Sequence, residues 1–404
     1  MSGTGTVDNP WDLETALASK SVCAGEHIRL RGGTYTGNFT CTLNGGSHTN
    51  PVFVESCPGK RAIINGGLDV RGGYVRIQNL EFVSPISTRE TQLPGSTPAD
   101  LMISQGVRIF GRGIEVVNNV IHDVLGSGIN VTTVAADTIV YGNLVCNYGW
   151  SGPDRGHGHG IYSENPIANG GRQIISNNIF FNGFCLGIKI YVQSPTPVGS
   201  YEVSRNICFN ANILYRIVGE QAEGWNIYAG QYNSQMRDLD FVENCTYHAR
   251  RIPSDQNVLG RRDGISNVRL IGNYWPEGYQ NENAEIVEEK DNYFGSVGAP
   301  VGNRVFVRPN KYQPGRANVT IYNEAEAESV SIDLSAVTGL QIGDSVIVRN
   351  VQDYFVDIQI LTLDADKKIT VNMLAANRTV STPIQWIAPA TTFPQFGCFV
   401  LEKA

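Results

Sequence analysis

The sequence predicts an all-β chain in which a solenoid of stacked parallel strands is followed by a small C-terminal antiparallel β-sandwich. Three observations support this prediction. A short motif containing asparagine recurs through the middle of the chain, short strands led by glycine recur between its copies, and the pattern changes after about residue 303. The predicted domains are therefore residues 1–303, which carry the candidate active site, and residues 304–404.

The composition agrees with a chain built of strands and turns. Of 404 residues 44 are glycine, whereas only 4 are methionine and 6 are histidine. The net charge of −7 disfavours nucleic-acid binding, which requires a basic surface. No apolar run approaches the ~18 residues of a membrane span, so we expect no membrane insertion. The first residues lack a basic segment followed by an apolar one, so no signal peptide is expected in this chain.

The recurring motif is a short apolar strand, an asparagine, apolar residues, and a second polar residue four positions after the asparagine. The separation between its first two copies leaves room for two or three short strands in each coil, and coils of parallel strands stack ~4.8 Å apart. Asparagine suits the bends because its amide can bond neighbouring copies and because it tolerates a left-handed φ. Longer separations then indicate loops inserted at one bend. The motif asparagines are Asn119, Asn143, Asn178, Asn206, Asn244 and Asn273, and the fourth-place partners are Asp123, Asn147, Asn182, Asn210 and His248.

Glycine-led strands lie between the motif copies, at Gly106, Gly128, Gly160 and Gly187. Because side chains alternate between the faces of a strand, the residue after each glycine points into the coil and the next one points outward. The mixture of cations, amide and aromatic rings on the outward face is typical of sugar-binding surfaces. The predicted outward ladder is Arg108, Asn130, Tyr162 and Lys189, flanked by Phe110, Thr132, Glu164 and Tyr191.

The candidate active site is the segment GWSGPDRGHGHGIYSEN, from Gly149 to Asn165, which is inserted before the third glycine-led strand. His157 and His159 are two residues apart, so in an extended segment both imidazoles project to one side, and the glycines between them leave the other side bare. The expected catalytic residues are Asp154, Arg155, His157, His159, Tyr162 and Lys189, and the expected substrate-binding residues are Arg108, Asn130, Trp150, Glu164 and Tyr191.

Structural roles for the same residues stay open. The two histidines could pack the loop against neighbouring carbonyls, or they could bind a divalent metal completed by Asp154 or His122, although no cofactor is predicted. Asp154 and Arg155 could form a loop-stabilising ion pair, and His122 and His248 occupy bends where hydrogen bonding is expected. If the histidines are catalytic and lie on an exposed loop, replacing them should abolish turnover without changing stability.

The eight cysteines show no CxxC spacing, so a zinc site is not expected. The segments that begin at Cys23 and Cys57 are similar and are interpreted as equivalent parts of successive coils. This interpretation predicts neighbouring thiols, either joined in a disulfide or stacked and buried.

The opening segment NPWDLETALAS…GEHIRLRGGTYTGNF and the asparagine-marked coils resemble the right-handed parallel β-helix proteins of the pectate-lyase-like superfamily, over roughly residues 5–300. The resemblance implies a carbohydrate-active protein, but the superfamily includes lyases, glycoside hydrolases, epimerases, esterases and phage tailspikes. Calcium-dependent pectate lyases carry an acidic cluster on this face, and the aligned strands lack one. The segment GPDRGHGHGIY is similar to the Asp/His-bearing loop of alginate C5-epimerases.

Lyase or epimerase chemistry on a uronic-acid polysaccharide is the favoured function. Cations would neutralise the sugar carboxylate, a base would remove the neighbouring proton, and an acid such as tyrosine would protonate the leaving oxygen. A glycoside hydrolase using Asp154 and Glu164 is the alternative, and a non-catalytic tailspike- or adhesin-like glycan-binding protein is a second one. We expect a secreted or extracellular protein, and the oligomeric state is not predicted.

Overall fold

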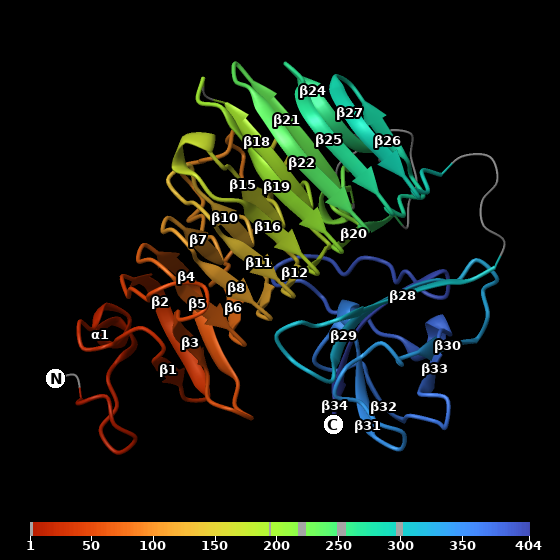
Figure 1. The fold of residues 1–404 in the computed structure, drawn as a ribbon, viewed down its shortest axis with the longest axis horizontal. Helices are drawn as coiled ribbons and strands as arrows, with labels where there is room; N and C mark the ends of the chain where they lie inside the picture. Colours follow the sequence, from red (N-terminus) through yellow and green to blue (C-terminus); the bar gives the residue numbers. More distant parts are fainter. Residues whose placement is uncertain (1–2, 194, 217–223, 249–255, 296–301) are drawn as a thin grey trace. The chain divides into compact units, whose positions relative to one another are not determined.

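The computed structural model describes residues 3–193, 195–216, 224–248, 256–295 and 302–404 (Figure 1). The chain divides into two compact units, Met1–Phe294 and Gly295–Ala404. None of the helices in the described residues is long and apolar enough to cross a membrane.

The first unit is a parallel β-helix with three rows of strands. One row is a ten-stranded sheet, here called face A. The other two rows share the long strand β4 (Ala62–Val70), whose first half pairs with β6 (Glu81–Val83) and whose second half pairs with β7 (Val107–Ile109). The row that continues from β6 is here called face B1, and the row that continues from β7 is called face B2.

Each coil visits the three faces in the order A, B1, B2. The strands of face A, in pairing order, are β1 (His27–Leu30), β3 (Val52–Ser56), β5 (Val75–Gln78), β8 (Glu115–Val117), β11 (Ile139–Tyr141), β16 (Gln173–Ser176), β19 (Val198–Ser204), β22 (Met236–Val242), β25 (Ile265–Ile271) and β27 (Ala284–Lys290). Face B1 continues from β6 with β9 (Val120–His122), β12 (Leu144–Cys146), β17 (Ile179–Phe181), β20 (Ile207–Phe209) and β23 (Cys245–Tyr247). Face B2 continues from β7 with β10 (Ile129–Val131), β15 (Ile161–Ser163), β18 (Ile188–Gln193), β21 (Ile227–Tyr232), β24 (Asn257–Arg262) and β26 (Tyr279–Asn281).

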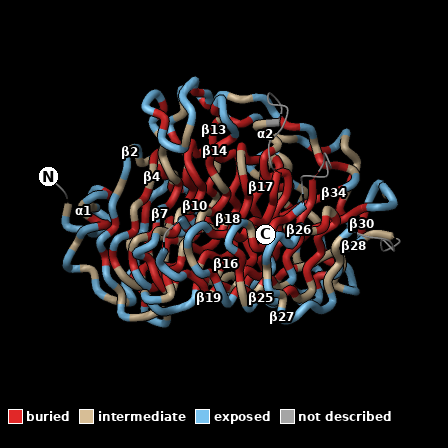
Figure 2. Tube along the Cα trace, turned by 90° about the horizontal axis from the view of Figure 1, so that it is seen from above, coloured by how far each residue is buried: buried red, intermediate tan, exposed pale blue. Residues whose placement is uncertain are grey.

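The predicted ladders of face B2 are confirmed. Successive strands pair Arg108 with Asn130, Asn130 with Tyr162, and Tyr162 with Lys189. The residues that precede these four in the chain, Val107, Ile129, Ile161 and Ile188, are fully buried inside the coil. Figure 2 shows this buried interior running along the unit beneath exposed bends. The sequence pattern therefore places the outward side chains correctly.

A short helix and a long strand cover the N-terminal coil. Helix α1 (Leu13–Ala18) begins at Asp12, whose side chain accepts a hydrogen bond from the Thr15 amide at 2.8 Å. It buries Leu13 and Leu17 in the same core as the coils, next to β2 (Gly33–Cys41), which pairs with β4. The helix removes the apolar end of the first coil from solvent, as a terminal cap of a solenoid must.

An asparagine ladder holds the coils in register at the bend between faces A and B1. Each side-chain amide donates to the side-chain oxygen of the next asparagine at 2.9–3.0 Å, and that oxygen also accepts the backbone amide of the asparagine below. The six predicted members are 0–1% exposed. Asn292, which the sequence motif did not include, continues the ladder from Asn273.

The predicted left-handed backbone lies one residue away from the ladder. The residue before each ladder asparagine adopts a positive φ, for example Asn118 (54°) and Arg205 (57°), whereas the ladder members do not. Four of the five fourth-place partners have a positive φ, namely Asp123 (49°), Asn147 (53°), Asn182 (50°) and Asn210 (52°). The expected bonding between copies of the asparagine is therefore confirmed, whereas the left-handed φ occurs in the residue before each ladder member.

The predicted pairing of the Cys23 and Cys57 segments is wrong. Residues 27–30 pair with 53–56 on face A, whereas Ala62, which follows Cys57, pairs with Gly33 on the other sheet. The two similar segments therefore form strands on different faces of the β-helix. Cys23 is exposed, and both thiols are free.

The second unit contains two antiparallel sheets around a separate apolar core. The five-stranded sheet has the order β28 (Arg304–Pro309), β29 (Arg316–Tyr322), β34 (Phe396–Lys403), β31 (Ser345–Asn350) and β32 (Ile358–Thr362), and the second sheet pairs β30 (Ser329–Asp333) with β33 (Lys368–Asn372). Val319, Val348 and Phe399 are among the buried residues of the core. The predicted sandwich is confirmed.

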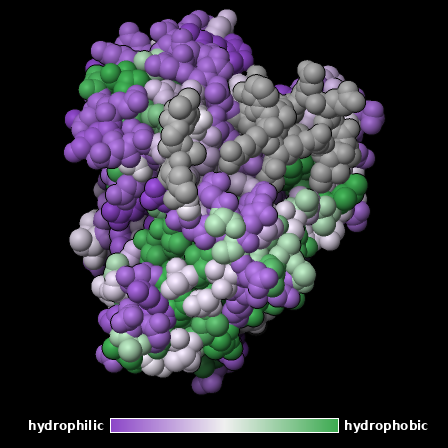
Figure 3. Space-filling view, turned by 90° about the vertical axis from the view of Figure 1, so that its right-hand side faces the viewer, coloured by the Kyte–Doolittle hydropathy of each residue, from purple (hydrophilic) through white to green (hydrophobic). Residues whose placement is uncertain are grey.

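The sandwich also exposes apolar side chains. Figure 3 shows a face of the molecule on which hydrophobic side chains gather. In edge strand β32 the two-residue alternation places Ile358 and Ile360 on the solvent side, with 39% and 69% of their surface exposed. The two-residue alternation in the sequence therefore predicts a strand here, but in β32 it does not put the apolar residues on the buried face.

The asparagine ladder leads to a stability prediction. Asn178→Ala removes the acceptor for the Asn143 amide and the donors to two backbone carbonyls and to Asn206. Because buried groups left unpaired cost ~1–3 kcal/mol each, we expect urea unfolding to show a loss of about 3–5 kcal/mol. The matched control is Asn292→Ala, at the partly exposed end of the ladder, which should cost less. Equal losses at both positions would contradict the view that burial of the ladder determines how much each asparagine stabilises the fold.

Candidate active site

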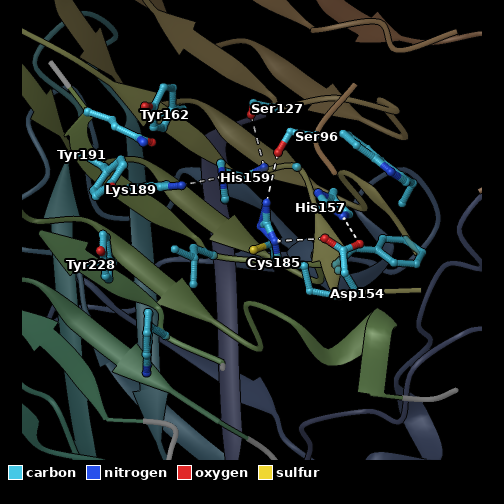
Figure 4. Close-up of a pocket in the computed structure, with 18 of the residues that line it drawn as sticks. Ser96, Ser127, Asp154, His157, His159, Tyr162, Cys185, Lys189, Tyr191 and Tyr228 are labelled. Carbon is cyan, nitrogen blue, oxygen red and sulfur yellow. Dashed lines mark hydrogen bonds and ion pairs between the residues drawn. The ribbon is translucent and has the colours of Figure 1, made fainter. Parts of the chain in front are cut away.

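A cavity of about 870 Å³ lies over face B2 of the β-helix. Its floor contains outward side chains of face B2, including Tyr162, Lys189 and Tyr228. Its walls come from connections between faces B1 and B2, which contribute Ser96, Ser127 and the segment 154–159 (Figure 4). The long connections 84–106 and 147–160 lie at this bend, as do the described residues 210–216 and 224–226. The prediction that the surplus residues are inserted at one bend is therefore confirmed.

The inserted segment folds into a two-stranded antiparallel hairpin. Strands β13 (Trp150–Ser151) and β14 (Gly156–His157) pair through Trp150 and His157. Glycine is required where the hairpin touches its neighbours, because a Cβ at Gly156 would lie 1.8 Å from the Phe184 carbonyl oxygen. The bare backbone of this segment therefore allows close approach to the adjacent coil.

A buried arginine fastens the hairpin to the helix. The Arg89 side chain is fully buried, and its guanidinium donates to the Gly149 carbonyl and to Asp123 Oδ1, both at 2.8 Å. The Arg89 carbonyl in turn accepts the Ser151 amide at 2.7 Å. The first strand of the hairpin is thus held by both the backbone and the side chain of one residue.

Asp154 and His157 form a pair at the cavity wall. His157 Nε2 donates to Asp154 Oδ1 at 3.0 Å, and the imidazole stacks on Trp150 with ring centroids 4.9 Å apart. Burial lowers the pKa of His157 more than Asp154 raises it. Burial raises the pKa of Asp154, but the hydrogen bond and the electrostatic interaction with His157, together with backbone hydrogen bonds that include the Gly95 amide, outweigh burial and lower that pKa overall. At neutral pH the pair is therefore a neutral imidazole donating to a carboxylate.

Two predictions about the histidines were wrong. His157 is only 2% exposed, so it does not lie on an exposed loop. The imidazoles also do not share one side: Gly158, at φ +81°, interrupts the extended backbone, and Figure 4 shows His157 directed to Asp154 and His159 directed to Lys189. The i, i+2 argument failed because it assumed an extended glycine between the two residues.

Lys189 and His159 form the second polar pair. Lys189 Nζ donates to His159 Nε2 at 3.4 Å and lies 5.1 Å from the Tyr162 ring centroid and 5.0 Å from that of Tyr191. Burial lowers the pKa of Lys189, and the positive charge of Arg155 contributes. Within the described part of the chain Lys189 forms no ion pair. An ammonium group in this position is poorly stabilised.

His159 is neutral and offers a donor to the site. Burial and the neighbouring Lys189 hold its pKa well below the usual histidine value. Because Nε2 accepts from Lys189, the ring proton lies on Nδ1, which is buried and has no hydrogen-bond partner among the described residues. A buried donor of this kind is costly unless a bound ligand accepts its hydrogen bond.

Arg155 presents a cation on the same wall. Its side chain is 46% exposed, Nη2 donates to Ser96 Oγ at 3.0 Å, and Nε lies 3.8 Å from Asp154 Oδ2. The distance to Asp154 leaves the planar fork of the guanidinium available to a carboxylate.

The cavity unites most of the predicted residues but not all of them. Asp154, Arg155, His157, His159, Tyr162, Lys189, Trp150 and Tyr191 line it. Arg108 does not, because Asp69 binds its guanidinium at 2.6 and 2.7 Å. Asn130 and Glu164 are not part of the lining, and Glu164 Oε1 accepts a hydrogen bond from the Tyr162 hydroxyl at 3.1 Å. Among the described lining residues Asp154 is the only carboxylate.

Sequence reasoning missed the end of the cavity formed by β21 and β24. The missed lining residues include Trp225, Tyr228, Arg261 and Arg262. They were missed because Asn226 replaces the leading glycine before β21: the Ile188 amide donates to the Asn226 carbonyl as the Ile161 amide donates to the Gly187 carbonyl. An asparagine in place of the glycine was therefore the sequence signal for β21.

The two bend histidines lie outside the cavity lining and have structural partners. His122 Nδ1 lies 2.9 Å from Asp123 Oδ2, and Nε2 lies 3.1 Å from Glu81 Oε1. Burial alone would lower the pKa of His122, but these hydrogen bonds raise it to about 9. His248 Nε2 donates to the Gly224 carbonyl at 2.6 Å. His122 therefore does not join His157 and His159, and no group of three histidine, cysteine or acidic side chains in the described residues is arranged to hold a metal ion.

The burial of His157 changes the expected outcome of its removal. His157→Ala deletes a buried ring stacked on Trp150 and leaves a cavity, so we expect a loss of about 2–3 kcal/mol in the free energy of unfolding. His27→Ala is the matched control, because His27 also stacks on an aromatic ring, Phe53, but its side chain is 36% exposed. Chemical denaturation measures both. An unchanged unfolding midpoint for His157→Ala would contradict this packing.

Comparison with protein-family models finds no match, and comparison with curated proteins finds none either. Solved structures that resemble the chain include pectate lyase Pel9A, at 13% identity and a TM-score of 0.47, covering 71% of this chain and 75% of that one. A rhamnogalacturonan lyase matches at 13% identity and a TM-score of 0.49, covering 74% of this chain and 86% of that one. An alginate lyase from Paenibacillus sp. str. FPU-7 matches at 15% identity and a TM-score of 0.41, covering 70% and 92%. These likenesses carry no argument about activity, and the strand pairing itself establishes that the chain is a parallel β-helix protein.

Proposed function

We propose that this protein is a polysaccharide lyase that cleaves a uronic-acid glycan by β-elimination, with Lys189 as the base. The observation that carries the proposal is the state of Lys189, a lysine in the cavity with a lowered pKa and no ion pair among the described residues. Such polymers occur outside cells, so the proposal includes a secreted protein.

A lysine serves as a base only when it can lose its proton near the working pH. Its ordinary pKa of about 10.4 is too high, and burial together with nearby positive charge is the usual way of lowering it. Both factors act on Lys189. The neutral His159 beside it accepts a hydrogen bond and adds no compensating negative charge.

The neighbouring side chains suit the other roles in elimination. Arg155 can bind the carboxylate of the uronate, which makes the adjacent C–H bond more acidic. Burial raises the pKa of Tyr162, so its hydroxyl keeps its proton at neutral pH, and by turning from Glu164 to the leaving oxygen it would act as the acid. Tyr162 and Lys189 are paired neighbours on face B2, so both reach the same sugar.

The proposed step is balanced within these groups. The neutral Lys189 amine removes the proton from the carbon next to the carboxylate. The electron pair of that C–H bond forms a carbon–carbon double bond, and the bond between the ring and the glycosidic oxygen breaks. The leaving oxygen takes the Tyr162 proton, and exchange with solvent restores both side chains.

Hydrolysis fits the cavity less well. Glycoside hydrolases place two carboxyl groups on either side of the bond, ~5–9.5 Å apart. Asp154 is the single carboxylate among the described lining residues, and Glu164 is hydrogen bonded to Tyr162. Epimerisation would begin with the same proton removal, and its products distinguish it from elimination.

Replacing Lys189 tests the assigned base. We expect Lys189→Met to lower turnover of acidic polysaccharides by about 10²–10⁴-fold, the usual contribution of a general base. The assay follows the ultraviolet absorbance of the unsaturated product and, in parallel, new reducing ends. Lys290→Met, a 65% exposed lysine on face A, is the matched control and should behave as wild type. Full activity of Lys189→Met, or reducing ends without the unsaturated product, would overturn the proposal.

The pH profile gives a separate check on Lys189. Only the deprotonated amine is active, so kcat/KM should rise with pH, with a midpoint below the ordinary lysine value of about 10.4. Arg155→Gln removes a positive neighbour, which stabilises the ammonium form and should move the midpoint to higher pH. Steady-state kinetics across the alkaline limb measures both effects. A midpoint that moves to lower pH in Arg155→Gln is the contrary result.

A further inference from the structure

We propose that Arg261 and Arg262 form a second anion-binding subsite, which binds an acidic group on another sugar of the same glycan. The inference rests on the proposed function for the identity of the ligand, but its evidence lies in a different part of the cavity. Both arginines line the cavity and belong to β24.

A β-bulge turns Arg261 toward the cavity. In the pairing of β21 with β24, Tyr228 faces Val258 and Ala229 faces Leu259, but Gly230 faces Arg261, so Gly260 is the extra residue. Gly260 adopts φ +78°, a conformation that glycine tolerates. Without the bulge Gly260 would occupy the outward position and Arg261 would point into the coil. Bulges commonly redirect a side chain next to a functional site.

The surroundings hold Arg261 in this outward position. Its guanidinium lies 4.9 Å from the Trp225 ring centroid, and Nη1 bonds Glu282 Oε1 at 2.5 Å. Trp225 in turn stacks on Tyr228, with centroids 5.1 Å apart and an interplanar angle of 9°. Gly230 leaves the space that a side chain would fill, because a Cβ there would lie 2.9 Å from the Arg261 Cβ.

Arg262 adds a cation in a strained backbone. Its φ of +71° is unfavourable for a residue with a side chain and costs on the order of 1 kcal/mol or more. Its guanidinium lies 5.1 Å from the Tyr232 ring, and it forms no ion pair with any described residue. Arg262 is exposed and lines the cavity, so its guanidinium is accessible to an anionic group of a bound glycan.

The position of the arginines requires a ligand longer than one sugar. Lys189 pairs with Tyr228, and Tyr228 pairs with Val258, so β24 lies two strands beyond the proposed base. Two strand spacings are about 10 Å, which exceeds the width of one sugar ring. The Trp225 and Tyr228 rings line the cavity near this second position, but only 6% and 5% of their surface is exposed, so they support Arg261 and the sugar itself contacts mainly the cations.

Binding of uronate oligosaccharides to the Lys189→Met protein tests the subsite, because that variant should leave the ligand intact. Calorimetry compares a disaccharide with a hexasaccharide from pectate- and alginate-type polymers, each in its acid form and as its carboxyl methyl ester. We expect the hexasaccharide acid to bind more tightly than the disaccharide. Adding Arg261→Gln and Arg262→Gln should weaken hexasaccharide binding by about 10-fold or more, because charge-assisted hydrogen bonds to the acidic group are lost.

The controls separate this inference from the proposed function. Arg237→Gln removes a 57% exposed arginine on face A and should leave binding unchanged, whereas Arg262→Lys should retain part of the affinity. Thermal melting shows whether each variant is folded. Unchanged affinity in the folded double variant, or equal binding of the methyl ester, would overturn the subsite even if the wild type shows lyase activity. Arginine-dependent binding without turnover would instead support the subsite and contradict the proposed lyase.

Discussion

The register between successive coils is the constraint on which the rest of the structure depends. The asparagine ladder fixes it, because each buried amide bonds both the side chain and the backbone of its neighbour. With this register in place, Tyr162, Lys189 and Tyr228 lie side by side on face B2, although they are far apart in the sequence. A shift of one residue would turn all of them into the coil.

The chemistry of the site follows from what is added to this regular frame. Insertions at the bend between faces B1 and B2 form walls over an outward face that would otherwise be open to water. The hairpin held by Arg89 is one wall and carries Asp154, Arg155 and His157. Enclosure removes solvent from Lys189 and His159, and this lowers the pKa of both groups. Strand β18 thus positions Lys189, and the inserted hairpin excludes water from it.

The repeating features of the strands could be predicted from the sequence, whereas features that depend on single residues or single contacts could not. The outward order of Arg108, Asn130, Tyr162 and Lys189 could be read from alternation, because each strand repeats one geometry. The direction of His159 depended on a single left-handed glycine, and the capture of Arg108 depended on Asp69, which lies on a neighbouring strand. The bulge that turns Arg261 outward is one extra residue, and nothing in the alternation predicts it.

The ionisation of Lys189 is the most direct test of the view that enclosure by the hairpin creates the reactive group. NMR titration of the protein labelled at the lysine ε-carbons would follow each lysine separately, with Lys189→Met identifying the resonance. One lysine should titrate clearly below the ordinary value of about 10.4, and its resonance should be absent from the variant. A Lys189 that titrates with the exposed lysines would contradict this account.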